Sequence, residues 1–302
     1  MYARGIIRFL VWATALIAVL RGTVYTDTFK PDTFPVIEAE KCAVCDTRIA
    51  SFNIRCADVN GMQIKDRIQI AIEQIWRIAP DSMGVQEATD EWMNALRRMP
   101  RYEVVGEGRE DDRKGEACPI LYNKVKYKLL DSGTFWLSET PETPSFGWDA
   151  ACKRICTWVK LRNRLTGAVY AHVNTHFDHV GKVAVVKEAE MLVDFIEREL
   201  AGIPVVFTAD LNATPDSDSY AVMTGALQDA RLTAADAVSY GTFHACSPET
   251  HADYYIDFVM TTPGLEVETY RTVTAGVSGR LVSYHFPIYA DVRLPDNGRT
   301  IS

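Results

Sequence analysis

Short apolar runs rich in β-branched residues alternate with amphipathic stretches along most of the chain, and this alternation limits the folds open to it. Runs such as 49–54 and 205–209 are typical of buried strands. Apolar residues recur at helical spacing over 65–78, 90–98 and 182–200, and further strands are expected at 82–86, 118–122, 126–137, 155–162, 168–175, 254–260, 267–273 and 286–294. The mixture shows no internal repeat, so it predicts one α/β domain over 47–295 with substantial antiparallel content.

Composition and charge narrow the classes of protein that fit. The chain has 302 residues, of which 47% are hydrophobic and 24% charged, so it can bury a sizeable core. Lysine and arginine total 32 against 40 acidic residues, a formal charge of −8, which argues against binding nucleic acid chiefly through a basic surface. Seven cysteines are too few for a disulfide scaffold, and the odd number leaves at least one unpaired in the monomer.

The N-terminus has the pattern of an export signal. Arg4 and Arg8 precede an apolar run over 9–20, which Arg21 closes, and this predicts a signal peptide over 1–21. No small-x-small triplet follows cleanly, so an uncleaved signal anchor is the alternative, and a buried core helix is the third interpretation. Removing 1–21 takes away three arginines and no acid, so the charge becomes −8 − 3 = −11. The protein is therefore expected to be secreted or extracytoplasmic, or held at a membrane by this segment.

Residues 22–46 are rich in Thr, Asp and Pro and are interpreted as a linker, and 296–302 as a tail. Cys42 and Cys45 form a C-x-x-C pair at the end of the linker. Zinc needs four ligands, and the only other close pair, Cys152 and Cys156, has a different spacing. A local disulfide or two inert thiols is therefore favoured over a metal or redox site.

Polar residues fall repeatedly at the ends of the apolar strands, where a rigid sheet can direct them toward one point. Taken singly, each is more typical of a helix cap, a solvated charge or a packed histidine. Taken together, they suggest a site. The six segments are Ser51-Phe52-Asn53-Ile54-Arg55, Gly84-Val85-Gln86-Glu87, Asn174-Thr175-His176-Phe177-Asp178-His179, Ala209-Asp210-Leu211-Asn212, Tyr255-Ile256-Asp257-Phe258 and Ser283-Tyr284-His285-Phe286-Pro287.

In this order the six segments resemble the endonuclease/exonuclease/phosphatase superfamily, the fold of DNase I, abasic-site endonucleases, neutral sphingomyelinases and inositol-polyphosphate phosphatases. The resemblance runs from Thr47 to Leu294, and segments 130–138, 147–151 and 154–158 are similar to one bacterial-type branch. It implies a four-layer α-β-β-α sandwich of two mixed, largely antiparallel sheets. It also implies a hydrolase that acts on phosphoric ester bonds.

Such hydrolysis needs an in-line water, stabilisation of charge on the phosphoryl oxygens and help for the leaving oxygen, and a divalent metal supplies the last two. The resemblance implies Glu87 as the metal ligand, with Asn53 beside it. A hard cation prefers one or two carboxylates, so Mg²⁺ is expected, with Mn²⁺ as the second choice. In most relatives an Asp immediately precedes the last His, and here that position is Tyr284, which predicts a site for one metal.

The remaining polar residues receive catalytic roles by the same resemblance. Asp210 is expected to be the general base, and Asn212 a donor to the phosphoryl oxygens; alternate positions on an extended chain would face the same side. An Asx turn before Pro215 is the alternative. Asp257 would orient His285, whose other ring nitrogen would donate to phosphate.

Five further residues are candidates. His176 resembles a second phosphate-contacting histidine, and Glu116 falls where relatives place its acidic partner, with a solvated carboxylate as the alternative. Arg55 is expected to share the face of Asn53, as a phosphate contact or as a surface salt bridge. Asp178 and His179 extend the site or cap the following helix.

Three functions remain open at this point. A metal-dependent phosphoesterase for a small or lipid-like phosphate leads, an extracellular nuclease follows, and a catalytically weak surface protein is third because of Tyr284 and the N-terminal segment. The expected partner is a phosphate-ester substrate; charge disfavours nucleic acid, since the densest basic segment, 109–114, also holds three acids. Membrane contact is expected only through the N-terminus, and no obligate protein partner is evident. The aromatic segment 135–148 is a candidate for recognising an apolar or sugar group, or packs beneath a loop.

Overall fold

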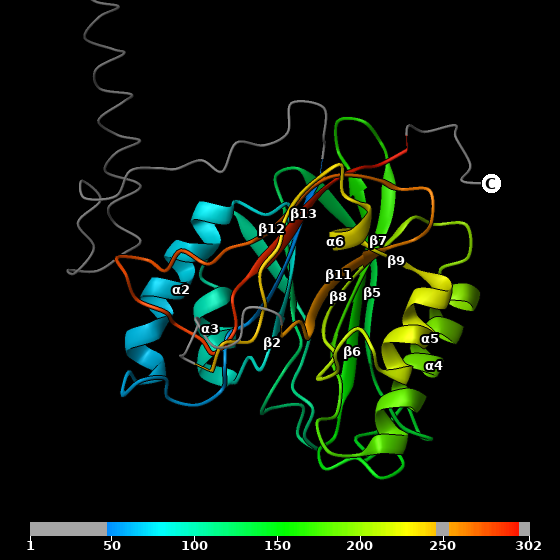
Figure 1. Cartoon of the computed structure of the whole chain (residues 1–302), viewed down its shortest axis with the longest axis horizontal. Helices are drawn as coiled ribbons and strands as arrows, with labels where there is room; N and C mark the ends of the chain where they lie inside the picture. Colours follow the sequence, from blue (N-terminus) through cyan, green and yellow to red (C-terminus); the bar gives the residue numbers. More distant parts are fainter. Residues whose placement is uncertain (1–46, 246–253, 296–302) are drawn as a thin grey trace, which may run out of the picture. The chain divides into compact units, whose positions relative to one another are not determined.

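Two mixed β-sheets pack face to face and helices cover their outer sides (Figure 1). The computed structural model describes residues 47–245 and 254–295. The predicted leader, linker, Cys42–Cys45 pair and tail lie outside the described residues. Within the described part, no helix is long and apolar enough to cross a membrane.

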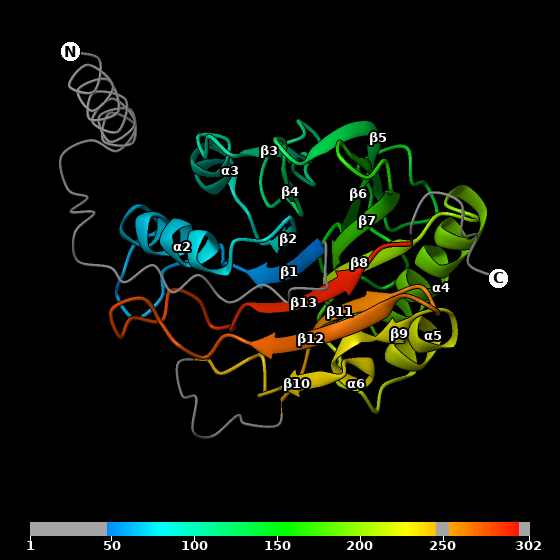
Figure 2. The same cartoon turned by 90° about the horizontal axis from the view of Figure 1, so that it is seen from above.

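The first sheet has seven strands in the order β10-β12-β13-β1-β2-β4-β3. In Figure 2, β13 lies between β1 and β12. Strands β1 and β2 are parallel, as are β10 and β12, and the other neighbours are antiparallel. The strands are β1 (Thr47–Asn53), β2 (Ser82–Gln86), β3 (Tyr102–Val105), β4 (Ile120–Asn123), β10 (Asp236–Val238), β12 (Glu266–Thr272) and β13 (Ile288–Arg293).

The second sheet has six strands in the order β5-β6-β7-β8-β11-β9. Only β7 and β8 are parallel neighbours. The strands are β5 (Tyr127–Trp136), β6 (Ile155–Asn163), β7 (Val169–His176), β8 (Val205–Asp210), β9 (Gln228–Asp229) and β11 (Asp257–Thr261).

Helices α2 (Ile64–Ile78) and α3 (Asp90–Leu96) lie outside the first sheet, and α4 (Lys182–Glu199) and α5 (Asp218–Ala226) outside the second (Figure 1). A short helix, α6 (Ala230–Thr233), follows β9. Helix α2 ends at Ile78 and is capped by Ala79, whose φ of 50° is left-handed and whose amide donates to the carbonyl of Ile75. The predicted four-layer α-β-β-α sandwich is confirmed.

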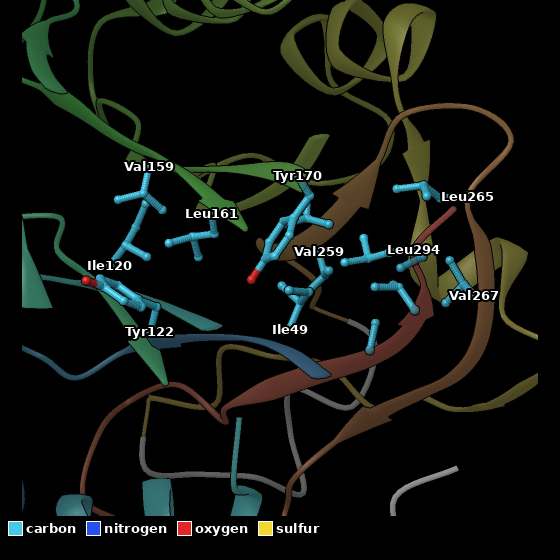
Figure 3. Close-up of a cluster of buried hydrophobic side chains, with 14 of the residues drawn as sticks. Ile49, Ile120, Tyr122, Val159, Leu161, Tyr170, Val259, Leu265, Val267 and Leu294 are labelled. Atoms are coloured by element: carbon cyan, nitrogen blue, oxygen red, sulfur yellow. The ribbon is translucent and has the colours of Figure 1, made fainter. Parts of the chain in front are cut away.

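Apolar side chains from both sheets meet in one core (Figure 3). Ile49 and Ile120 come from the first sheet, and Val159, Tyr170 and Val259 from the second. A second core joins the outer face of the second sheet to α4 and α5, and its members include Val173, Phe207, Leu192, Ile196 and Met223. Burial of both faces of the second sheet explains why a strand such as β8, with the sequence VVFTAD, is buried along its whole length.

Each strand and helix predicted from the sequence overlaps an observed element, with boundaries shifted by up to three residues. The prediction missed β3, β9, β10, α5 and α6. These elements are short or weakly patterned: β10 is three exposed residues, and α5 has no marked apolar face. Their formation depends on neighbours in the fold more than on local pattern.

The topology brings six chain segments to one end of the sandwich. Strands β1, β2, β7 and β8 run toward this end, and β11 and β13 start there, as the pairings Asn53–Gln86, His176–Asp210 and Asp257–Asp210 show. All six motifs of polar residues therefore lie at this end, four following strands and two preceding them.

Candidate active site

Asn53 connects the two sheets at the centre of the site. Its side-chain nitrogen Nδ2 donates to Oε1 of Glu87 at 3.0 Å and to Oδ2 of Asp210 at 2.8 Å. All three side chains are buried. The amide therefore holds one carboxylate from the end of each sheet close together.

Glu87 is an ionised carboxylate within a set of donors. Its Oε2 accepts from the backbone amide of Cys56 at 2.9 Å, and Nη1 of Arg55 lies 3.5 Å away. Burial would raise the pKa of Glu87, but the hydrogen bonds from Cys56 and the charge of Arg55 outweigh it and lower that pKa. The Arg55 guanidinium also lies over the ring of Tyr284, 5.0 Å from its centroid.

Three residues one or two positions after a strand adopt left-handed backbone torsions. They are Arg55, Glu87 and Asn212, with φ of 62°, 59° and 47°. Side-chain oxygens of Asn53 and Asp210 accept from the amides of Arg55 and Asn212, at 3.0 and 2.9 Å, and so form Asx turns. The argument from alternate positions on an extended chain is wrong for both pairs, because each strand has already ended. The turns nevertheless keep Arg55 and Asn212 beside the site.

His285 and two aspartates form a buried charged cluster. Nδ1 of His285 lies 2.8 Å from Oδ2 of Asp257, and its Nε2 lies 3.8 Å from Oδ2 of Asp210. Burial would lower the pKa of His285, but the two aspartates raise it to about 9, so the ring is cationic at neutral pH. Burial and the charge of Asp257 raise the pKa of Asp210, against the opposing effects of His285 and of its hydrogen bonds.

His176, by contrast, is neutral. Nδ2 of Asn212 donates to the carbonyl of Phe177 at 2.9 Å, and the same nitrogen lies 2.9 Å from Nε2 of His176. An amide nitrogen only donates, so Nε2 is the acceptor and the ring proton is on Nδ1. Burial, and then the charge of Arg154, lower the pKa of His176 well below its usual value.

The acidic partner implied for His176 is bound elsewhere. Oε1 of Glu116 accepts from Nη2 of Arg109 at 2.8 Å, and Nε2 of His176 faces Asn212 and Asp210 instead. A guanidinium is a permanent cation with several donors, so it pairs with Glu116 better than a neutral imidazole does. The implied His176–Glu116 pair is therefore not formed.

Asp178 has a structural role in the described part of the chain. Its two oxygens accept from the amides of Ala151, Cys152, Val180 and Gly181, which ties the loop after β5 to the start of α4. These bonds favour the helix-cap interpretation over an extension of the site. His179 lies next to it, with Nδ1 3.1 Å from Nη2 of Arg154.

The sequence argument missed three cations beside the site: Arg109, Lys153 and Arg154. They line a small cavity together with Glu87 and His176. Arg154 stands at the head of segment 154–158, which carries the bacterial-type resemblance, and this was the one signal that pointed to it. Arg109 and Lys153 have no comparable signal, because surface loops commonly carry such residues.

The donors at the site fit a divalent cation. Carboxylate oxygens of Glu87 and Asp210 both lie within 3.0 Å of the amide nitrogen of Asn53, and hard cations prefer oxygen ligands. Asp210, Asp257 and His285 also present one ligand atom each within 4.8 Å of one another. Oδ1 of Asp257 is buried and has no hydrogen-bond partner among the described residues, so the site has unused acceptor capacity.

Comparison with known proteins identifies the class. The model of the endonuclease/exonuclease/phosphatase family matches residues 50–285. An endonuclease/exonuclease/phosphatase from Bacteroides vulgatus is 36% identical with a TM-score of 0.78, and the alignment covers 82% of this chain and 99% of that one. A search of curated proteins gives no match.

Two further solved structures are similar. The mannosyl-6-phosphatase Bt3783 of Bacteroides thetaiotaomicron is 29% identical with a TM-score of 0.77, and the alignment covers 82% of this chain and 99% of that one. The human Nocturnin catalytic domain, solved with bound sulfate, is 18% identical with a TM-score of 0.66 over 82% of this chain and 94% of that one, a likeness that shows the fold alone.

Fold and family together define a hydrolase that acts on phosphoric ester bonds. The chain belongs to the endonuclease/exonuclease/phosphatase family. This family generally depends on a divalent metal, in agreement with the oxygen-rich donors of the site.

Proposed function

We propose that the protein is a Mg²⁺-dependent phosphoesterase for a small or lipid-like phosphate ester, with Mn²⁺ as the second candidate ion. The observation that carries the proposal is the double hydrogen bond of Asn53, which holds Glu87 and Asp210 together beside the cationic His285. The similarity to the mannosyl-6-phosphatase of B. thetaiotaomicron supports a small phosphate monoester as the substrate.

Each residue has a part in the proposed reaction. Glu87 and Asn53 would hold the metal, which when bound supplies positive charge for the phosphoryl and leaving oxygens. Asp210 takes a proton from the attacking water, the water oxygen bonds to phosphorus, and the phosphorus–ester oxygen bond breaks. The leaving oxygen takes a proton from solvent, so a monoester yields an alcohol and inorganic phosphate.

The other side chains stabilise the phosphoryl group. Asp257 fixes the His285 ring through Nδ1, and the protonated Nε2 donates to a phosphoryl oxygen. Asn212 directs both hydrogens of its amide nitrogen to Phe177 and His176, so it positions His176, whose Nδ1 proton is a further donor. Arg55, with one carboxylate neighbour at 3.5 Å and its side chain 35% exposed, contacts the same phosphate from the solvent side.

We also propose that the site holds one metal ion, because Tyr284 replaces the Asp that most relatives have before the last histidine. Isothermal calorimetry with Mg²⁺ and Mn²⁺ should give one tight ion per chain, and Tyr284→Asp should add a second. Two equivalent tight ions in the wild type would refute this stoichiometry.

Two other functions, a nuclease and a catalytically weak surface protein, are the alternatives to this proposal. A nuclease would use the same residues, but a formal charge of −8, or −11 without residues 1–21, repels a long polyanion. A catalytically weak surface protein is motivated by Tyr284 and the apolar N-terminal run. We propose that the protein acts outside the cytoplasm, secreted or held by that run; sequencing the N-terminus of native protein tests this, and an intact, cytosolic Met1 would contradict it.

A substrate panel separates the three functions. Bis-p-nitrophenyl phosphate, p-nitrophenyl phosphate, plasmid DNA and sphingomyelin are each incubated with Mg²⁺ or with EDTA. Mg²⁺-dependent release from the small esters or from sphingomyelin supports the leading proposal, and preferential cleavage of DNA supports the nuclease. No Mg²⁺-dependent turnover of any of the four favours the binding protein.

A further inference from the structure

The two most exposed large hydrophobic side chains of the described residues lie at the end of the sandwich opposite the candidate site. Leu165, in the turn between β6 and β7, is 94% exposed, and Val125, in the turn between β4 and β5, is 73% exposed. Strand β7 runs from this end to His176 at the site, and Tyr127, the first residue of β5, pairs with Asn163, the last residue of β6. Both turns therefore belong to the end far from the site.

The two turns lie side by side. The backbone amide of Arg164 donates to the carbonyl of Lys126 at 2.9 Å, and its Nε donates to the carbonyl of Lys124 at 3.3 Å. Val125 stands between these two lysines, and Leu165 directly follows Arg164. A single exposed apolar side chain is ordinary on a protein surface, but two in adjoining turns indicate a surface that contacts something else.

The same local device holds both apolar side chains outward. Oδ1 of Asn123 accepts from the amide of Val125 at 3.1 Å, and Oδ1 of Asn163 accepts from the amide of Leu165 at 2.9 Å. Each turn thus repeats the order Asn, basic residue, apolar residue, and its Asn side chain fixes the backbone. Both apolar side chains are therefore presented to solvent by a fixed turn and do not fold back onto the sheets.

Basic side chains border the two apolar ones. Lys128 on β5 lies directly opposite Arg162 on β6, and neither has an ion-pair partner among the described residues. Like charges in directly opposite positions destabilise a sheet, and an anion between them would remove that cost. A groove of about 380 Å³ is lined by both of them, by Arg164 and by Leu165. Together with Val125 these four residues form one surface, the turn surface.

The apolar N-terminal run joins the domain at the same end. Oγ1 of Thr47, the first described residue, lies 2.8 Å from the hydroxyl of Tyr127, which follows the turn that carries Val125. The apolar run over 9–20 precedes Thr47 by the predicted linker 22–46. A membrane that holds this run would therefore lie nearer to the turn surface than to the candidate site.

We propose that the turn surface docks on an anionic lipid membrane, with Val125 and Leu165 inserted at the headgroup level and the basic side chains against lipid phosphates. Apolar side chains flanked by lysine and arginine bind such an interface by burying apolar area and by attraction to anionic lipids. A soluble polyanion would use the charges but leave the apolar side chains in water. A second copy packed on this surface about a two-fold axis would bring like charges together. Docking in this way leaves the candidate active site facing solution.

Binding of the full chain to vesicles tests the turn surface. Sedimentation measures partition onto phosphatidylcholine vesicles with and without phosphatidylglycerol. Lys128→Glu should weaken binding to the phosphatidylglycerol vesicles roughly tenfold or more, because each basic side chain at such a surface contributes about fivefold and the variant reverses one charge. The variant should fold, since its carboxylate lies opposite Arg162. Leu165→Ser should weaken binding by roughly tenfold, because it removes the inserted side chain.

Two matched variants change the same kinds of side chain at the end that carries the site. Lys114→Glu alters a lysine side chain that is 66% exposed, and Val183→Ser alters a valine at the start of α4 that is 52% exposed. Neither should change the partition onto either kind of vesicle. A decrease as large as that of Lys128→Glu and Leu165→Ser would overturn the assignment to the turn surface.

Lysine labelling separates the turn surface from the N-terminal run, which is the same in every variant. With vesicles that contain phosphatidylglycerol, acylation of Lys128 by a soluble reagent should slow severalfold, while Lys114 keeps its rate. No binding to these vesicles, or an unchanged rate at Lys128 in the bound protein, would overturn the proposal.

The other occupants give different results. Weaker binding of Lys128→Glu with unchanged binding of Leu165→Ser would indicate a site for a soluble polyanion, and a dimer in ultracentrifugation that Leu165→Ser dissociates would indicate a second copy. Either result would overturn membrane docking. None of these measurements needs turnover, so the outcome does not depend on the proposed phosphoesterase function.

Discussion

Gly84 on β2 faces Asn174 on β7 across the two sheets so closely that a Cβ on Gly84 would lie 2.3 Å from the Asn174 Oδ1. It would also lie 2.0 Å from Oγ1 of Thr208. At this distance Asn174 hydrogen-bonds across the two sheets. Its Nδ2 donates to the carbonyls of Val85 and Pro119, and its Oδ1 accepts from Gln86. The polar layer beneath the site thus depends on the absence of one methyl group.

Gly84→Ala should destabilise the fold, because a methyl group there forces the sheets apart or displaces Asn174. Overpacking of this kind costs about 1–3 kcal/mol in unfolding free energy, which urea denaturation would measure. Gly225→Ala on α5 is the control, since nothing lies within 4 Å of its Cβ position. Equal stability of the two variants would contradict the close approach.

Glu87→Gln should weaken both metal binding and turnover, because the amide lacks the negative charge that a divalent ion needs. Turnover of p-nitrophenyl phosphate is expected to fall by roughly two orders of magnitude or more, since positioning and charge stabilisation account for most of such a barrier. Calorimetry with Mn²⁺ gives the binding change independently. Glu107→Gln, which changes an exposed carboxylate paired with Arg113, should have neither effect.

The raised pKa of His285 predicts a loss of activity at alkaline pH. Although burial opposes it, Asp257 and Asp210 raise the pKa of His285 to about 9, so the ring is cationic at neutral pH and loses its proton as the pH rises through that value. Profiles of kcat/KM against pH should therefore fall above about pH 9. Asp257→Asn removes the partner that raises this pKa and should move the alkaline limb to lower pH; an unmoved limb would exclude His285 as its origin.

The lowered pKa of His172 predicts a loss of stability at acid pH. It lies in the core between the hydroxyls of Ser82 and Thr208, and burial lowers its pKa to about 3. The unfolded chain binds a proton near the ordinary histidine value and the folded chain does not, so stability falls as the pH drops through the interval between the two pKa values.

The pH dependence of stability follows from one proton, which the unfolded chain binds and the folded chain does not. From about pH 6 to about pH 4.5 the wild type should lose about 1.4 kcal/mol of unfolding free energy per pH unit more than His172→Gln. Gln keeps a donor and an acceptor for the two hydroxyls but does not titrate. Parallel stability curves for the two proteins would show that His172 is protonated in the folded state as well.

Local pattern was enough to predict most of the strands, and the end of the sandwich where polar residues gather. Apolar runs such as 205–209 form strands almost regardless of context, and the residues that follow them are fixed at the strand ends. Pairing between distant loops is different, because it depends on tertiary placement. The Arg109–Glu116 pair and the buried Arg154 therefore could not be inferred. The Asx turn that carries Asn212 was one of two interpretations left open by the sequence, and the structure has it.

At Arg55, Glu87 and Asn212 the left-handed backbone torsion favours a different residue than the one the site requires. Glycine adopts such torsions with no steric penalty, whereas other residues are strained there. A screen for thermal tolerance alone would thus favour glycine at these positions, and each replacement would remove a guanidinium, a carboxylate or an amide from the site. Variants that gain thermal stability by substitution at these three positions should therefore have the lowest phosphoesterase activity.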